Sequence, residues 1–371
     1  MSLRDRGADA RHGLTRRHLG RLALAAGAWG LNGSLRAADP PFYKDKSNLL
    51  VYLDGTGASR AVKSEADWKI RRSHIVANME LVMGPLPDIP KGPLDIEFKD
   101  ELEFENYTRR RITYLARPGD RVPAYLMIPR GRSGRLRAAV CPHPTSNRFG
   151  KGIPAGVAGA PNRAYAHELA GRGYVTISPD YPYMGEKQAD PYSLGYVSGT
   201  MKAIYNHIRA VDLLAEMPRV DAGRIASIGH SLGGHNSLFL AVFEPRVRAV
   251  VTSCGFNAFP KYYKGDLTGW SSDKYMPRIS ERYGKDPKRM PFDFTELLAA
   301  IAPRPVFINA PTGDDNFEVS GVKDCLAAAR PVYDKVFGAG DRLVAVHPDC
   351  GHDFPDEVRE QAYSFMDRWL G

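Results

Sequence analysis

Cysteine is scarce in this chain of 371 residues: there are four, and none has the paired spacing of a zinc finger. No apolar run is long enough to form a permanent membrane-spanning helix, which argues against an integral membrane protein. No Lys/Arg-rich stripe with interleaved aromatic residues is present, so nucleic acid is not an expected partner. Internal repeats and low-complexity tracts are absent as well. What remains, with 43% hydrophobic and 25% charged residues, is the composition of a globular protein with a sizeable core.

Much of the formal net charge of +9 comes from the first 38 residues, which hold seven Arg and two Asp. Without them the chain has 44 basic and 40 acidic residues, a net charge of +4. In this segment Arg16-Arg17 precede an apolar, Ala-rich run over 22–31 and small residues at Ala37-Ala38, as in a twin-arginine export signal. We therefore expect residues 1–38 to direct export to the periplasm or beyond in a bacterium. A lipid-facing anchor or a basic tail is the alternative, and no clean Ala-x-Ala cleavage site is visible.

The remaining chain divides into an N-terminal extension over 39–93 and a main domain over 94–371. The extension is rich in Pro and Gly, but its apolar residues recur at helical spacing from Glu65 to Met83. The main domain begins with two strand-like runs, 111–115 and 122–128. A Pro-Gly-Asp turn separates them, which predicts an antiparallel hairpin.

After this hairpin, short apolar strands alternate with helical patterns, which is typical of a parallel sheet with helices on both faces. The predicted strands are 136–141, 174–178, 225–228, 249–253, 306–309 and 343–346. The predicted helices are 163–170, 197–216, 232–243, 322–336 and 357–370. The fold class is therefore α/β.

The most informative stretch is Gly229-His230-Ser231-Leu232-Gly233, a Gly-x-Ser-x-Gly pattern between a predicted strand and a predicted helix. In this setting the pattern predicts a nucleophile elbow, in which a strained turn lifts the Ser231 hydroxyl above the sheet. The flanking glycines have no Cβ, so strand and helix approach closely beneath it. An ordinary structural turn is the alternative interpretation.

A serine nucleophile needs a general base and an acid that orients it, and in α/β-hydrolases the chain order is Ser, acid, His. His352 follows the last predicted strand and precedes the last helix, where the base belongs. The acid is expected in the loop after 306–309, which carries both Asp314 and Asp315. We favour Asp314 by its distance from the start of the strand, and Asp315 remains the alternative.

Two backbone amides should stabilise the oxyanion, those of Leu232 and Thr145. Thr145 follows His143-Pro144 in the loop after 136–141, and we expect His143 to have a structural role. Residues 255–291 interrupt the strand–helix alternation with many aromatic and basic residues, at the position of a cap over the site. Trp270, in the middle of this insertion, is the residue predicted to bind substrate.

With these residues in view, the chain from about Trp68 onward resembles the dienelactone hydrolase and acetyl xylan esterase-like branch of the α/β-hydrolase superfamily. The resemblance rests on Gly-His-Ser-Leu-Gly-Gly at 229–234, on Asp-Tyr-Pro-Tyr-Met-Gly-Glu at 180–186 and on Gly351-His352. It implies a mainly parallel eight-stranded sheet and hydrolysis of carboxylic esters through an acyl-enzyme without a cofactor. The resemblance does not specify the substrate, but the aromatic and basic residues of the insertion favour a sugar or aryl ester, including one that carries a carboxylate. The expected substrate is therefore a small-molecule or oligosaccharide ester, including acetyl and other acyl esters of carbohydrates.

Two other functions stay open at this point. A prolyl-oligopeptidase-like peptidase has the same order of catalytic residues, and a non-catalytic binding protein can share the scaffold. A zinc site built from His347, Cys350, His352 and Asp353 is disfavoured, because the elbow needs His352 as its base, so no metal is expected. Pairing of Cys325 with Cys350 and the oligomeric state remain undecided.

Overall fold

The computed structural model describes residues 39–371, so the export signal predicted over 1–38 lies outside the described residues. The main sheet has nine strands in the order β11-β10-β9-β8-β6-β7-β5-β4-β3. Their bounds are β3 (Glu97–Glu103), β4 (Tyr107–Arg117), β5 (Asp120–Pro129), β6 (Leu136–Val140), β7 (Val175–Pro179), β8 (Val220–His230), β9 (Val247–Ser253), β10 (Val306–Asn309) and β11 (Leu343–Val346). A separate hairpin joins β1 (Val51–Leu53) to β2 (Ser59–Ala61).

Neighbouring strands are parallel in the part of the sheet that runs β11-β10-β9-β8-β6-β7. The pairs β7–β5, β5–β4 and β4–β3 are antiparallel. The predicted α/β class, the mainly parallel sheet and the antiparallel hairpin are therefore confirmed. The sheet has nine strands rather than eight. The unpredicted strand β3 reads Glu-Phe-Lys-Asp-Glu-Leu-Glu and lies at the sheet edge, where its charged side chains face solvent or the arginines of β4. A strand of this kind has no apolar pattern to reveal it.

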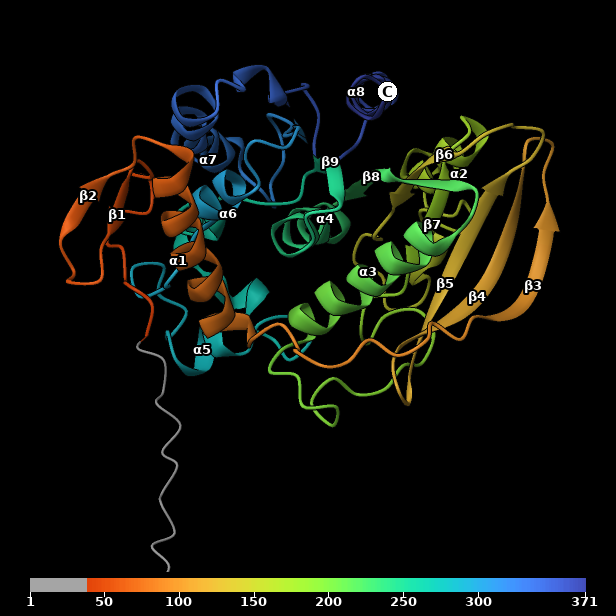
Figure 1. The fold of residues 1–371 in the computed structure, drawn as a ribbon, viewed down its shortest axis with the longest axis horizontal. Coiled ribbons are helices and arrows are strands. Elements are labelled where there is room, and N and C mark those ends of the chain that lie inside the picture. The colour runs from red at the N-terminus through yellow and green to blue at the C-terminus, as the bar shows by residue number, and fades with distance from the viewer. Residues whose placement is uncertain (1–38) are drawn as a thin grey trace, which may run out of the picture. The chain divides into compact units, whose positions relative to one another are not determined.

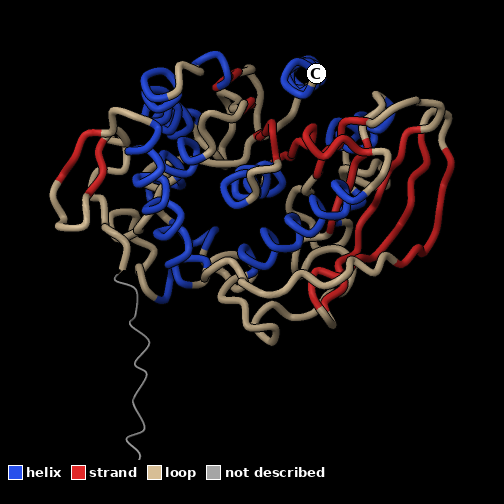
Figure 2. Tube along the Cα trace, in the orientation of Figure 1, coloured by secondary structure: helices blue, strands red, loops and turns tan. Residues whose placement is uncertain are grey.

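Helices cover both faces of this sheet, as Figures 1 and 2 show. Their bounds are α1 (Glu65–Met83), α2 (Tyr165–Gly171), α3 (Gly199–Glu216), α4 (Leu232–Phe243), α5 (Arg278–Glu281), α6 (Phe294–Ala300), α7 (Val319–Pro331) and α8 (Asp356–Leu370). Helices α2 and α8 pack on one face, against Ala139, Ala249 and Phe307. Helices α3, α4, α6 and α7 pack on the other, against Val140, Val250 and Ile308. Neighbouring strand residues thus supply opposite cores, as the two-residue period of a strand requires.

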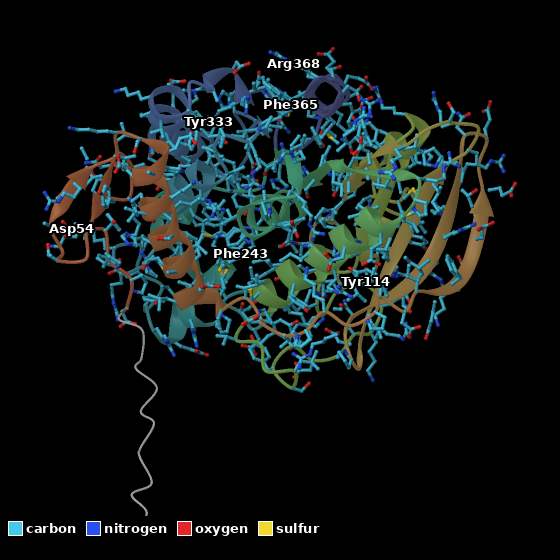
Figure 3. All side chains as sticks on the ribbon, viewed as in Figure 1. Asp54, Tyr114, Phe243, Tyr333, Phe365 and Arg368 are labelled. Atoms are coloured by element: carbon cyan, nitrogen blue, oxygen red, sulfur yellow. The ribbon has the colours of Figure 1, made fainter. Side chains whose placement is uncertain are left out.

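The two cores hold most of the large apolar side chains. Tyr114 of β4 belongs to the core beneath α3, whereas Phe365 of α8 belongs to the other, and Figure 3 labels both. Cys141, Cys254 and Cys325 are buried, and all four cysteines are free thiols, so Cys325 and Cys350 do not pair here. Among the described residues no helix is long and apolar enough to cross a membrane.

The N-terminal extension contributes α1, which Ser64 and Asp67 begin with a reciprocal capping box. Trp68, Ile75 and Met79 of this helix are buried. Arg71 forms a fully buried ion pair with Glu296 of α6, with 2.5 Å between Nη2 and Oε1. Because an unpaired buried charge costs several kcal/mol, this pair fixes how α1 and α6 meet. The extension is thereby attached to α6, one of the helices that pack on the same face of the sheet as α3 and α4.

Candidate active site

Ser231 lies between β8 and α4 in a conformation that L-amino acids rarely adopt, with φ 54° and ψ −123°. Its amide donates to Ser253 O at 2.8 Å, and its carbonyl accepts from the amide of His235 at 3.0 Å. These bonds tie the turn to β9 and to the first turn of α4. The strained serine between strand and helix is the geometry that the sequence predicts for a nucleophile elbow.

The glycines on either side of Ser231 are required by contact distances. A Cβ on Gly229 would lie 2.2 Å from the carbonyl carbon of Gly233. A Cβ on Gly233 would lie 2.2 Å from the carbonyl oxygen of Pro142, in the loop after β6. No side chain fits at such distances, so only glycine lets β8, α4 and the β6 loop meet under Ser231.

His352 follows β11 and forms a hydrogen bond with Asp314, which follows β10. Its Nδ1 lies 3.0 Å from both carboxylate oxygens. The Asp314 side chain is 1% exposed, whereas that of His352 is 26% exposed. Asp314 Oδ1 also accepts from the amides of Asn316 and Phe317, each at 2.9 Å. Burial acts to raise the pKa of Asp314, but the hydrogen bonds from His352 and these amides outweigh it and hold that pKa below its usual value.

Of the two adjacent carboxylates, the structure therefore brings Asp314 to His352, and Asp315 faces solvent. An ionised carboxylate against Nδ1 favours the tautomer that leaves Nε2 free to accept a proton. The pair can thus act as an oriented general base. The ring centroid of His352 lies 4.9 Å from that of His230, the residue just before Ser231.

Residues that the sequence analysis did not single out hold the His352 loop in place. Arg163 donates to the carbonyl of His352 at 3.0 Å and to Asp353 Oδ1 at 2.6 Å. Asn162 donates to the same Asp353 oxygen at 2.7 Å. Asn309, at the end of β10, donates to the carbonyl of Asp353 at 2.8 Å. Nothing in the sequence pattern links these residues, because they are 44 to 191 positions from Asp353.

Cys254 follows β9 and lies against the acid–base pair. Its sulfur, an Asp314 oxygen and a His352 nitrogen lie within 4.8 Å of one another, a donor set that zinc accepts in proteins. Burial first and the Asp314 charge second raise the pKa of the Cys254 thiol, which favours its neutral form. A metal ion at this point would have to displace the His352–Asp314 hydrogen bond. This cluster differs from the zinc site disfavoured in the sequence analysis, which included His347. The Nδ1 atom of His347 forms a hydrogen bond with the carbonyl of Ala310 at 2.8 Å.

The expected oxyanion donors lie on the two elements that meet under Ser231. Leu232 is the first residue of α4, so its amide has no acceptor within the helix. Thr145 is exposed in the β6 loop. The amide of Tyr181 donates a hydrogen bond to His143 Nε2 (2.9 Å), and His143 Nδ1 donates to the Pro144 carbonyl (2.7 Å). Its buried ring therefore shapes the loop.

The insertion over 255–291 contains two 3₁₀ turns (Tyr262–Gly265 and Leu267–Trp270) and α5. It also contacts the loop after β7, where the Tyr181 hydroxyl donates to the Lys274 carbonyl at 2.8 Å. Trp270, the predicted substrate-binding residue, is 5% exposed. Its ring stacks on His235 with 4.4 Å between centroids and also lies near Phe317. Most of the Trp270 side chain is thus packed inside the protein.

The chain is similar to several known hydrolases. The family described as "Glucuronyl esterase, fungi" matches residues 192–337. YtaP of Bacillus subtilis (strain 168), named as a hydrolase, is 24% identical over 304 residues, 78% of this chain and 96% of YtaP. The 4-O-methyl-glucuronoyl methylesterase 1 of Wolfiporia cocos is 25% identical over 201 residues, which cover 49% of this chain and about half (48%) of that protein.

Two solved structures show the same fold at low sequence identity. A glucuronoyl esterase from Solibacter usitatus superposes with a TM-score of 0.68 at 19% identity, over 90% of this chain and 100% of that one. The acetyl xylan esterase 1 from Thermoanaerobacterium sp. JW/SL YS485 gives a TM-score of 0.55 at 18% identity, over 81% of this chain and 94% of that one. The fold is the α/β-hydrolase fold of these esterases, and together with the family match over residues 192–337 these findings indicate a carboxylic ester hydrolase.

Proposed function

We propose that this protein is an exported serine esterase that hydrolyses carboxylic esters of carbohydrates through a Ser231–His352–Asp314 triad. The observation that carries the proposal is the buried Asp314 carboxylate, 3.0 Å from Nδ1 of His352, in loops at the same sheet edge as the strained Ser231 turn. Relatives named as glucuronoyl esterases and acetyl xylan esterases support a sugar ester as substrate.

In the proposed reaction, Ser231 Oγ attacks the ester carbonyl carbon while His352 Nε2 takes the hydroxyl proton. The amides of Leu232 and Thr145 donate to the oxyanion that develops on the carbonyl oxygen. Collapse of the tetrahedral intermediate breaks the bond to the alcohol, which leaves with the proton from His352. Water, deprotonated by the same imidazole, then attacks the acyl-enzyme and releases the acid and free Ser231.

The test is a substrate panel with the full chain and its Ser231→Ala variant. Benzyl glucuronate, acetylated xylo-oligosaccharides and p-nitrophenyl acetate represent the two ester classes and a small reference ester. Aminoacyl anilides represent the peptidase alternative. We expect turnover of at least one sugar ester and a fall in kcat of several orders of magnitude in Ser231→Ala. Cleavage of anilides alone would favour the peptidase, and near-normal ester turnover by folded Ser231→Ala would refute the assignment.

Export is the second part of the proposal, and it rests on the sequence of residues 1–38. Arg16 and Arg17 followed by the apolar run over 22–31 have the features of a twin-arginine signal. A fusion of residues 1–45 to a folded reporter should leave the bacterial cytoplasm. Changing both arginines to lysine should stop that export, and persistent export would reject this route.

A further inference from the structure

Two exposed tyrosines lie on loops at the same sheet edge as Ser231. Tyr183 is in the loop after β7, and Tyr263 is in the insertion after β9. Strands β7, β8 and β9 run in the same direction, with β7 on one side of β8 and β9 on the other. Loops that follow parallel strands emerge at one edge of a sheet, so these two loops lie on opposite sides of the Ser231 turn, with the loop after β6 between that turn and the β7 loop.

Both tyrosines have a left-handed backbone, which is uncommon for residues other than glycine. Tyr183 has φ 65°, and Tyr263 has φ 43° and is followed by Lys264 with φ 58°. The two tyrosine side chains nevertheless remain 41% and 56% exposed. Strained backbone clusters at functional sites, and here it holds two aromatic side chains at the surface.

Neither ring is free to move in the way of an ordinary surface tyrosine. The Tyr183 hydroxyl donates to the Asp190 carboxylate. The Tyr263 hydroxyl donates to Asn316 Oδ1 at 3.0 Å, and the Tyr262 ring meets it edge-on with 4.8 Å between centroids. A ring that is exposed and already fixed loses little conformational entropy when a flat apolar ligand packs on it.

The partners of these tyrosines connect them to the catalytic groups. Asn316, which holds Tyr263, donates its amide to Asp314, the partner of His352. On the other side, Met184 follows Tyr183 and packs in one cluster with Leu232, the residue after Ser231. Tyr263 therefore belongs to the His352 side of the site and Tyr183 to the Leu232 side.

We propose that Tyr183 and Tyr263 are two sugar-stacking platforms that bind the saccharide chain carrying the ester, on either side of Ser231. The C–H-rich faces of pyranose rings are the ligands that fit exposed, immobilised phenol rings. This inference rests on the proposed carbohydrate esterase function and adds where the sugar chain lies.

Binding is tested without turnover, in the full chain carrying Ser231→Ala, by calorimetric titration with xylohexaose. Adding Tyr183→Ala or Tyr263→Ala should weaken binding about two- to tenfold each, the range for one aromatic contact. Phe98→Ala is the matched control, because Phe98 is 61% exposed on edge strand β3, away from the Ser231 strand, and should bind as its parent does. Unchanged binding in both tyrosine variants overturns the proposal, as does the lack of saturable binding in the parent.

Kinetics separate this proposal from the esterase assignment. In proteins that retain Ser231, each tyrosine variant should lower kcat/KM for an esterified oligosaccharide two- to tenfold more than for p-nitrophenyl acetate. Equal losses on both esters would mean that the tyrosines only support the fold. A protein that cleaves no ester would refute the proposed function, whereas the titration would still report on the platforms.

A second variant removes the positioning of Tyr263 and keeps its ring. Asn316→Ala deletes the acceptor of the Tyr263 hydroxyl but leaves the backbone amide that Asp314 accepts. It should weaken xylohexaose binding in the same direction as Tyr263→Ala, by a smaller factor. Tyr263→Phe also lacks this hydrogen bond and should match Asn316→Ala. Normal xylohexaose binding by all three variants, Asn316→Ala, Tyr263→Phe and Tyr263→Ala, contradicts the platform.

Discussion

Asp314→Asn isolates what the negative charge beside His352 does, because the rest of the loop can stay as it is. Both loop amides, those of Asn316 and Phe317, donate to Oδ1. An asparagine that keeps its carbonyl oxygen at that position preserves both hydrogen bonds. Its NH₂ group then occupies the Oδ2 position, 3.0 Å from Nδ1 of His352.

An NH₂ group there donates a hydrogen bond to an unprotonated Nδ1, which favours the tautomer with the imidazole proton on Nε2 over the one that donates to the carbonyl kept at Oδ1, also 3.0 Å from Nδ1. In that tautomer His352 cannot take the Ser231 proton, and the imidazolium formed during reaction loses its anionic partner. We expect kcat to fall about 1,000- to 10,000-fold, which corresponds to about 4–5.5 kcal/mol of lost transition-state stabilisation. The assay is steady-state hydrolysis of p-nitrophenyl acetate, with thermal unfolding of each variant alongside.

Asp315→Asn is the matched control, since Asp315 is adjacent in sequence, faces solvent and makes the same change of charge. It should leave kcat within about twofold of the parent, as for most exposed substitutions. A loss of less than tenfold in folded Asp314→Asn, or an equal loss in Asp315→Asn, would refute the assignment of the triad acid.

Three further predictions concern the support of Ser231, His352 and Asp314. Arg163→Met should lower kcat up to about 100-fold by loosening the His352 loop, with partial rescue by Arg163→Lys; unchanged kinetics would contradict this positioning role. Gly229→Ala should destabilise the fold by about 1–3 kcal/mol in denaturant unfolding and abolish activity, because its Cβ has no room. Since the pKa of Asp314 is lowered in the folded state, its contribution to stability should be complete above about pH 4 and lost as pH falls through the lower folded value. Asp314→Asn should therefore unfold with a shallower acid dependence than the parent, and identical profiles would contradict the shift.

The sequence predicted best those elements whose periodicity and chemistry are local. Helices α1 and α4 and strands β10 and β11 have the predicted bounds, because the apolar residues of each segment and the polar, Gly or Pro residues beside it mark the element locally. The position of Ser231 followed from the Gly-x-Ser-x-Gly pattern, and those of the Asp314 and His352 loops followed from the order of Ser, acid and His along the chain. The preference for Asp314 over Asp315 rested only on distance from the start of the strand. The choice depends on which carboxylate the loop turns inward, and the amides of Asn316 and Phe317 bind the Asp314 carboxylate there.

Other parts of the site depend on contacts that no local pattern records. Arg163 meets Asp353 from 190 positions away, and Cys254 reaches Asp314 only because β9 and β10 are neighbours. The sequence did not predict strand β3, because an exposed edge strand has charged residues where a central strand has apolar ones.

The sequence and the structure predict different roles for Trp270. Its position in an aromatic insertion predicts a platform for substrate, and on that basis Trp270→Ala raises KM for sugar esters with little effect on p-nitrophenyl acetate. In the structure the ring is 5% exposed and stacks on His235, one helical turn after Ser231. Truncating a buried tryptophan costs about 3–5 kcal/mol.

From this packing we expect Trp270→Ala to unfold at lower denaturant concentration and to lose activity on both esters together. Tyr263→Ala is the comparison, because its ring lies in the same insertion but is 56% exposed and should cost far less stability. If Trp270→Ala keeps the stability of the parent and loses activity on sugar esters alone, then the edge that reaches the surface contacts substrate. The paired variants therefore distinguish an insertion that binds sugar through its buried tryptophan from one that uses this tryptophan to hold its exposed tyrosine in place.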